Sequence, residues 1–250
     1  MTFSRNEGGN NILPIVEISH LTKEYDAVTA VRDITLNIAK GELFGLLGPN
    51  GSGKTTMIRL LTGQIRPTRG TARVTGLSIE EHPVEIRERV GIIPEQETPP
   101  SFLTAEEYLQ FVARVRNIPD ADGGGDRWFR FLEFEDKKDV LCKDLSRGTR
   151  QKLMFAQAFL HQPKLVFIDE PLINLDPIMQ RKVKDFLGDY VKDGGTVFLS
   201  THILEIAEEI CTRVGIIHQG SILFDGSIGD LRSKETSLEA FFLSLVHQKR

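Results

Sequence analysis

The stretch Gly48-Pro49-Asn50-Gly51-Ser52-Gly53-Lys54-Thr55 matches the phosphate-binding pattern G-x-x-x-x-G-K-[ST]. Glycines in such a loop let the backbone turn tightly and aim N–H groups at phosphate oxygens. The helix expected after the loop adds a partly positive N-terminus. We expect Lys54 to reach the β- and γ-phosphates of ATP, and the Thr55 hydroxyl to ligate Mg²⁺. The nucleotide-binding residues that this pattern predicts are Gly48, Asn50, Gly51, Ser52, Gly53, Lys54, Thr55 and Thr56.

The residues around this loop have the pattern of an α/β protein. Leu43–Leu47 before the loop is a continuous apolar run, typical of a strand covered on both faces of a parallel sheet. Leu165–Ile168 and Thr196–Leu199 have the same character, and Gly215–Ile217 is a weaker candidate. This context favours a phosphate-binding loop over a glycine-rich turn that binds nothing.

The segments on either side of the phosphate-binding loop predict half-buried strands and a helical region. Between Ile15 and Ile79 apolar and polar residues alternate, as in half-buried strands. From Pro99 to His161 the pattern is helical, with Thr104 and Glu107 placed as a capping box. Aromatic residues in this part could form a small core or a surface for a partner. They are Phe102, Tyr108, Phe111, Trp128, Phe129 and Phe131.

Acidic residues and a histidine follow two of the predicted strands. Asp169 and Glu170 come directly after Leu165–Ile168, and His202 follows the run that ends at Leu199. Nucleotide sites in open α/β sheets gather at the carboxyl ends of strands, so these side chains should approach the phosphates. We expect Asp169 to bind the metal, Glu170 to polarise the attacking water, and His202 to contact the γ-phosphate or that water. The alternatives are a solvated acidic pair and a structural histidine.

Composition sets broad limits on function. The 250 residues carry a formal net charge of -4, which argues against a nucleic-acid partner. No apolar stretch approaches the roughly 18 residues that span a bilayer. Residues 1–11 are polar and lack the apolar core of a signal peptide. We therefore expect a cytoplasmic protein with reduced cysteines, Cys142 and Cys211, whose membrane role would require a partner.

The order of these motifs resembles that of the ATP-binding subunits of ABC transporters. Leu145-Ser146-Arg147-Gly148-Thr149-Arg150-Gln151-Lys152 is similar to the signature motif of that family, and Ile173-Asn174-Leu175-Asp176 to its D-loop. His202 stands where the family has its switch histidine. Tyr25 stands where the family stacks an aromatic ring on adenine, although an ordinary tyrosine of a sheet is the alternative.

The resemblance implies a fold as well as a site. The family has a P-loop NTPase (RecA-like) α/β core, an N-terminal antiparallel β subdomain and an inserted α-helical subdomain. We predict a loose tail over 1–14 and one ATPase domain over 15–250. Within it we expect the core and β subdomain over 15–96 and 162–235, the helical subdomain over 97–161, and a C-terminal helix over 236–250.

The resemblance also implies a mechanism. Two such subunits would pair head to tail, and each site would join the P-loop of one copy to Ser146, Arg147, Gly148 and Asp176 of the other. Lys54, Glu170 and His202 would be catalytic, with Mg²⁺ held by Thr55, Asp169 and either Glu95 or Gln96. ATP binding and hydrolysis would then drive a separately encoded membrane permease from the cytoplasmic face of the membrane.

Several residues depart from the family pattern. Arg147 replaces the first signature glycine, Thr149 replaces the glutamine, and Asn174 replaces a glycine. Arg147 could place a positive charge near the phosphates or at the dimer interface, or it could face solvent. Glu95 stands in the Q-loop position, with Gln96 one residue later.

The variant motifs are similar to those of the drug, antibiotic or sodium exporter branch, so we expect an exporter. One alternative is a soluble ABC-type ATPase that acts in translation, repair or cofactor assembly. Another is a regulatory subunit that binds ATP and barely hydrolyses it, which Arg147 and Glu95 suggest. The complete set Lys54, Asp169, Glu170 and His202 argues against the second alternative.

Overall fold

The computed structural model describes residues 14–96, 98–118, 125–170, 172, 174–232 and 237–247. A six-stranded sheet with the order β10-β9-β3-β8-β7-β6 lies at its centre. All its neighbouring strands are parallel except β10, which is antiparallel to β9. The strands are β3 (Leu43–Leu47), β6 (Gly91–Ile93), β7 (Leu165–Asp169), β8 (Thr196–Thr201), β9 (Arg213–His218) and β10 (Ser221–Ser227).

Both faces of this sheet are covered, as the continuous apolar runs predict. Every residue of β3, β7 and β8 is buried. Because side chains alternate along a strand, Leu43 and Leu47 pack into one core cluster, whereas Phe44 and Leu46 pack into the other. The weaker candidate, Gly215–Ile217, is confirmed as part of β9.

A second, antiparallel sheet has the order β2-β1-β4-β5. Its strands are β1 (Val16–Tyr25), β2 (Val28–Ile38), β4 (Arg69–Val74) and β5 (Leu77–Ser78). The alternating residues behave as predicted, since Val16 faces Ile38, Ile18 faces Leu36, and all four side chains are buried. Helix α1 (Lys54–Leu61) packs between the two sheets and contacts β2 and β4 on one side and β7 and β8 on the other.

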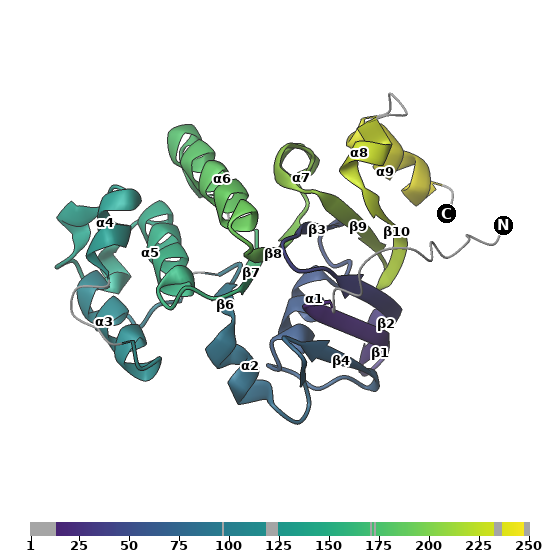
Figure 1. The fold of residues 1–250 in the computed structure, drawn as a ribbon, viewed down its shortest axis with the longest axis horizontal. Helices are drawn as coiled ribbons and strands as arrows, with labels where there is room; N and C mark the ends of the chain where they lie inside the picture. The colour runs from purple at the N-terminus through teal and green to yellow at the C-terminus, as the bar shows by residue number, and fades with distance from the viewer. Residues whose placement is uncertain are drawn as a thin grey trace.

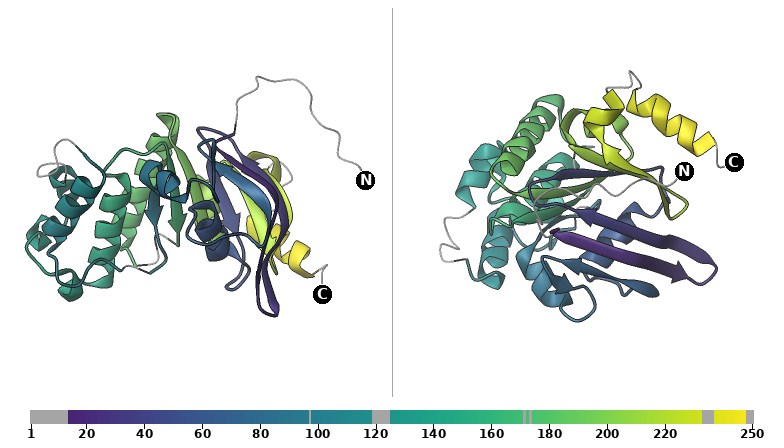
Figure 2. Two further views of the ribbon diagram at one scale, coloured as in Figure 1. Left: turned by 90° about the horizontal axis from the view of Figure 1, so that it is seen from below. Right: turned by 45° about the vertical axis from the view of Figure 1, so that its right-hand side comes forward.

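The helical part lies on the β6 side of the central sheet, where α5 packs against β6, and it lies away from the antiparallel sheet (Figures 1 and 2). It contains α3 (Ala105–Val115), α4 (Asp126–Phe131), α5 (Arg147–Phe159) and two short 3₁₀ turns, Glu135–Lys137 and Cys142–Asp144. Thr104 and Glu107 form the predicted capping box of α3. Of the aromatic set, Tyr108, Trp128 and Phe129 are buried in the core and Phe131 packs against it, whereas Phe102 and Phe111 are 76% and 54% exposed. A role of the exposed residues in binding a partner stays a prediction.

Five further helices complete the described structure. Helix α2 (Pro83–Arg89) precedes β6, and α6 (Pro177–Lys192) joins β7 to β8. Helices α7 (Leu204–Ile210), α8 (Ile228–Arg232) and α9 (Leu238–His247) lie toward the C-terminus, and α9 is at the end of the molecule opposite α3 (Figure 1). In the described ranges, no helix combines the length and apolar character needed to cross a bilayer.

Some of the predictions lie wholly or partly outside the described residues. Residues 1–13 of the expected tail, Ile173 of the D-loop-like segment, and residues 236 and 248–250 of the expected C-terminal helix are among these. The domain limits stay a prediction. Cys142 and Cys211 are both buried.

Candidate functional site

Glycine geometry shapes the loop between β3 and α1. Gly51 and Gly53 have φ angles of 77° and 112°, in the left-handed region that side chains other than glycine rarely adopt. A Cβ on Gly53 would lie 2.3 Å from the Ala30 carbonyl oxygen. Gly53 is also the N-cap of α1, so the cap brings no side chain to compete for the first N–H groups of the helix. The loop thus presents helix donors beside Lys54.

A polar cavity of about 200 Å³ joins this loop to the ends of β6 and β7. The predicted residues that border it come from both sides. They are Asn50, Gly51, Gly53, Lys54, Thr55, Thr56, Glu95, Asp169 and Glu170. A neighbouring polar cavity of about 230 Å³ shares Thr55, Glu95 and Asp169 with it and adds Gln96. The structure therefore brings the P-loop together with both acids and with both Q-loop candidates.

Lys54 is a nearly buried cation among carboxylates. It is 6% exposed, and Nζ donates to the carbonyl oxygens of Gly48 and Pro49 at 2.8 and 3.2 Å. Nζ also lies 3.9 Å from Oε1 of Glu170. Burial lowers the pKa of the Lys54 ammonium, while the charges of Glu170, Asp169 and Glu95 act against that shift. This placement suits a cation that neutralises phosphate charge.

Hydrogen bonds fix both the backbone and the side chain of Glu170. Its φ of 52° is left-handed, a conformation that costs a residue with a side chain about 1–3 kcal/mol unless its surroundings fix it. The backbone N–H donates to the Ser200 carbonyl oxygen at 3.0 Å. The Thr201 hydroxyl donates to Oε2 at 2.9 Å, and the His202 N–H donates to Oε1 at 2.9 Å. The carboxylate consequently has one defined orientation at the cavity wall.

The end of β8 supports both acids. Ser200 Oγ donates to Oδ1 of Asp169, and Thr201 contacts Glu170. Both hydroxyl residues are fully buried. Ser200 and Thr201 were not among the predicted site residues, although two polar residues at the carboxyl end of an apolar run were the available signal. They position the carboxylates that border the cavity.

His202 lies beside Glu170 and does not border the polar cavity. Its side chain is 42% exposed, and Nδ1 is 2.7 Å from Oε1 of Glu170. Since Nδ1 is engaged with that carboxylate, Nε2 is the ring nitrogen left for an incoming group. The histidine can therefore connect the acid to a ligand on its other side.

The signature-like residues lie elsewhere in the chain. Ser146 is the N-cap of α5, and its Oγ accepts from the Thr149 N–H at 3.1 Å. Arg147 is exposed. Gly148 approaches the D-loop-like segment so closely that an added Cβ would lie 2.7 Å from the Asn174 carbonyl oxygen. None of these residues borders the polar cavity.

Two other predicted residues also stand apart from the cavity. Asp176 caps α6, where its Oδ1 accepts from the Met179 N–H at 3.0 Å, and this bond lowers the pKa of the carboxyl group. Tyr25 is 42% exposed at the end of β1, with Nζ of Lys23 at 4.9 Å from the centre of its ring. The cavity of one chain thus contains only part of the predicted nucleotide-binding set.

Comparison with known proteins identifies the family. The family model described as "ABC transporter" matches residues 31–173. The chain belongs to the ABC transporter family. It is an ATP-binding, ATP-hydrolysing ABC subunit, and its fold is the expected P-loop core with an antiparallel β subdomain and a helical subdomain.

Individual ABC proteins match over most of the chain. The bacitracin transport ATP-binding protein BcrA of Enterococcus faecalis is 33% identical, over 92% of this chain and 75% of that protein. The Nod factor export ATP-binding protein I of Ralstonia nicotianae is 34% identical, over 89% of this chain and 70% of its own length. A solved ATP-binding subunit of an ABC transporter has a TM-score of 0.86 and 30% identity, covering 93% of this chain and 99% of that one.

The donor set of the ABC site fits a magnesium ion bound together with a nucleotide. Among the residues that the structure describes, no group of three or more His, Cys, Asp and Glu side chains could hold a metal by itself. The Thr55 hydroxyl and the carboxylates of Asp169 and Glu95 do border one cavity. Mg²⁺ prefers such oxygen ligands and commonly takes one or two carboxylates, with water and phosphate oxygens completing its shell.

Proposed function

We propose that this ABC subunit powers a separately encoded membrane exporter, by hydrolysing ATP between two ATPase subunits paired head to tail. The observation that carries the proposal is the division of the site within one chain. The P-loop meets Asp169 and Glu170 in the polar cavity, whereas Ser146 and Gly148 border no part of it. Ser146, at the exposed start of α5, is available to a second subunit.

The residues that border the polar cavity, and His202 beside it, have distinct roles in this proposal. Lys54 and the N–H groups at the start of α1 bind the β- and γ-phosphates. Glu170 accepts a proton from the water that attacks the γ-phosphorus, as the bond to the bridging oxygen of ADP breaks and phosphate leaves. His202 holds Glu170 through Nδ1 and presents Nε2 to the γ-phosphate.

Thr55 and Asp169 are the proposed magnesium ligands, with Glu95 or Gln96 acting directly or through water. When bound, the ion neutralises charge between the β- and γ-phosphate oxygens. Tyr25 contributes its ring to the adenine, and Ser146, Arg147, Gly148 and Asp176 act on the nucleotide of the opposite subunit.

Exposed apolar side chains offer a docking face for the permease, on the cytoplasmic side of the membrane. Phe111 and Val115 are one helical turn apart on α3, and Phe102 lies just before that helix. Glu95 and Gln96, which border the polar cavities, connect the end of β6 to this segment. Movement at the nucleotide can therefore reach the docking face along a short stretch of chain. The similarity to a Nod factor export ATP-binding protein supports export as the direction.

The experiment is affinity purification of the tagged full-length chain from detergent-solubilised membranes. We expect a polytopic membrane protein to co-purify, and Phe111→Asp to reduce its recovery about tenfold or more. The matched control is Leu243→Asp on α9, another exposed apolar residue at the opposite end of the molecule. Recovery of ribosomes, nucleic acid or assembly proteins without any membrane protein would contradict the proposal and favour a soluble ATPase.

A further inference from the structure

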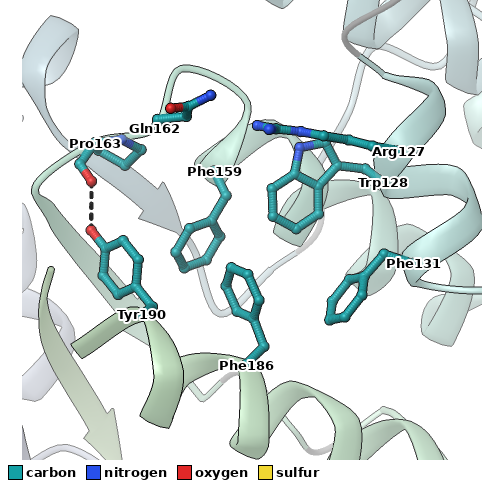
Figure 3. Close-up of a pocket in the computed structure, with 8 residues that line it drawn as sticks. All are labelled: Arg127, Trp128, Phe131, Phe159, Gln162, Pro163, Phe186 and Tyr190. Atoms are coloured by element: carbon teal, nitrogen blue, oxygen red, sulfur yellow. Dashed lines mark hydrogen bonds between the residues drawn. The ribbon is translucent and has the colours of Figure 1, made fainter. Parts of the chain in front are cut away.

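A larger cavity, of about 400 Å³, lies between the helical subdomain and α6 and shares no lining residue with the nucleotide cavity (Figure 3). Five aromatic rings form its walls. They belong to Trp128 and Phe131 of α4, Phe159 of α5, and Phe186 and Tyr190 of α6. Its volume falls within the range of about 300–1,000 Å³ that is usual for small-molecule sites.

The aromatic walls hold one another in place. The ring centres of Trp128 and Phe186 are 5.5 Å apart, and those of Phe159 and Phe186 are 5.0 Å apart, both with edge-to-face geometry. Tyr190 is fixed at its far end, where its hydroxyl donates to the Pro163 carbonyl oxygen at 2.6 Å. A ligand would therefore meet a preformed apolar surface and pay little to order it.

A buried, unpaired hydrogen-bond donor lies beside one rim of this surface. Trp128 is only 5% exposed, and its indole Nε1–H has no hydrogen-bond partner within the described residues. Leaving such a donor buried and unpaired costs about 1–3 kcal/mol. Figure 3 shows the Arg127 guanidinium beside this nitrogen, with the Gln162 side chain across the same rim.

The charge at the rim is positive. The Arg127 guanidinium lies 5.2 Å from the Trp128 ring, and no carboxylate pairs with it among the described residues. The eight residues that line the cavity include no acidic side chain. The Arg127 charge favours an anionic head group at this rim, and a purely apolar ligand would leave the Trp128 N–H unpaired.

We propose that this cavity binds a small amphipathic anion. Its acyl or aromatic body lies among Phe131, Phe159 and Phe186, and its carboxylate accepts from Trp128 Nε1 and from Arg127. Hydrogen bonds to a charged acceptor are roughly twice as strong as neutral ones, so the head group sets the selectivity. The site shares no lining residue with the nucleotide cavity.

Trp128 itself provides the test, because it is the only tryptophan of the chain. We would titrate the full chain with decanoate below its micellar range, and with decyltrimethylammonium as the probe of opposite charge. Decanoate should change the tryptophan emission saturably, with half-saturation below about 1 mM. The ammonium probe should produce no saturable change. Equal responses to both probes, or none to decanoate, would overturn the proposal.

Two variants locate the binding. Arg127→Gln should weaken decanoate binding about tenfold, since it removes a charged hydrogen bond. Lys182→Gln is the matched control, because Lys182 lies 5.1 Å from the Phe131 ring but does not line the cavity. It should leave the affinity within about twofold. If both variants weaken binding equally, or Arg127→Gln has no effect, the anion does not bind as proposed. Unchanged ATP affinity would show that each variant is folded.

Discussion

Nδ1 of His202 lies 2.7 Å from Oε1 of Glu170, and the His202 backbone N–H donates to that same oxygen at 2.9 Å. The second carboxylate oxygen accepts from Thr201 Oγ1 at 2.9 Å. Together with the left-handed backbone of Glu170, these bonds leave the carboxylate a single orientation. In the proposed mechanism, this fixed orientation means that the Glu170 carboxylate need not be reorganised during the reaction.

The first prediction concerns Glu170. Glu170→Gln keeps the size of the side chain but removes its basicity, so steady-state phosphate release should fall about 100-fold or more. ATP affinity should change little, and ATP-dependent dimers should persist in gel filtration. Glu205→Gln, at an exposed position of α7, is the control and should retain full turnover. Turnover of Glu170→Gln at the parental rate would remove Glu170 from the mechanism.

The second prediction concerns the buried cation. Lys54→Met removes the positive charge that faces Glu170, Asp169 and Glu95, and these carboxylates would then repel the phosphates. Calorimetry with Mg²⁺ present should show ATP affinity reduced about tenfold or more. Lys40→Met, at an exposed site, should bind ATP like the parent. Equal affinities for the two variants would contradict the phosphate-binding role of Lys54.

The sequence predicts best those features that are formed by residues close together in the chain. The strand Leu43–Leu47 and the Thr104–Glu107 capping box are short-range patterns, and the structure contains both. The prediction that Asp169 and Glu170 lie near the P-loop is confirmed. It could be made from the sequence because β3 and β7 are parallel, so their carboxyl ends lie on the same side of the sheet.

Other features depend on tertiary contacts that no local pattern encodes. The support of Asp169 by Ser200 joins residues of different strands, 31 positions apart. The burial of Trp128 and the exposure of Phe111 follow from which neighbours pack against α4 and α3, so the aromatic set could not be divided from its spacing. The position of Tyr25 outside the polar cavity likewise reflects how the antiparallel sheet sits on the core.

A third prediction tests the contact between the signature-like residues and the D-loop-like segment. A Cβ on Gly148 would lie 2.7 Å from the Asn174 carbonyl oxygen, which is closer than side-chain carbons approach backbone oxygens. Gly148→Ala should therefore displace one segment, with a loss of roughly 1–3 kcal/mol in the free energy of unfolding. Urea denaturation measures this loss, and phosphate release should fall with it.

Gly188→Ala is the matched control for that substitution. Gly188 lies inside α6, and a Cβ there would meet no atom within 4 Å. Because alanine has fewer unfolded conformations and a higher helix propensity, this variant should gain about 0.5–1 kcal/mol. Equal stability changes in the two variants would show that the contact with Asn174 does not constrain the chain.

The last prediction is a pH dependence of stability that arises at His161. Nη1 of Arg116 is 2.8 Å from Nε2 of His161, and since a guanidinium can only donate, the imidazole accepts and must be neutral. Burial is the main cause that lowers the pKa of His161 to about 4, and the Arg116 charge lowers it further. In the unfolded chain the pKa returns to about 6.5.

The sign follows from proton binding. Between these pKa values the unfolded chain binds more protons than the folded one, so the stability present above pH 6.5 is lost as the pH falls toward 4. From pH 7 to pH 5 the loss due to His161 should be up to about 2 kcal/mol, measured as the difference between the parent and His161→Gln in urea denaturation. Lys40→Met, at an exposed residue that does not titrate in this range, should lose as much stability between pH 7 and pH 5 as the parent. If the parent and the His161→Gln variant have the same pH dependence, Arg116 does not donate to a neutral His161 imidazole in solution.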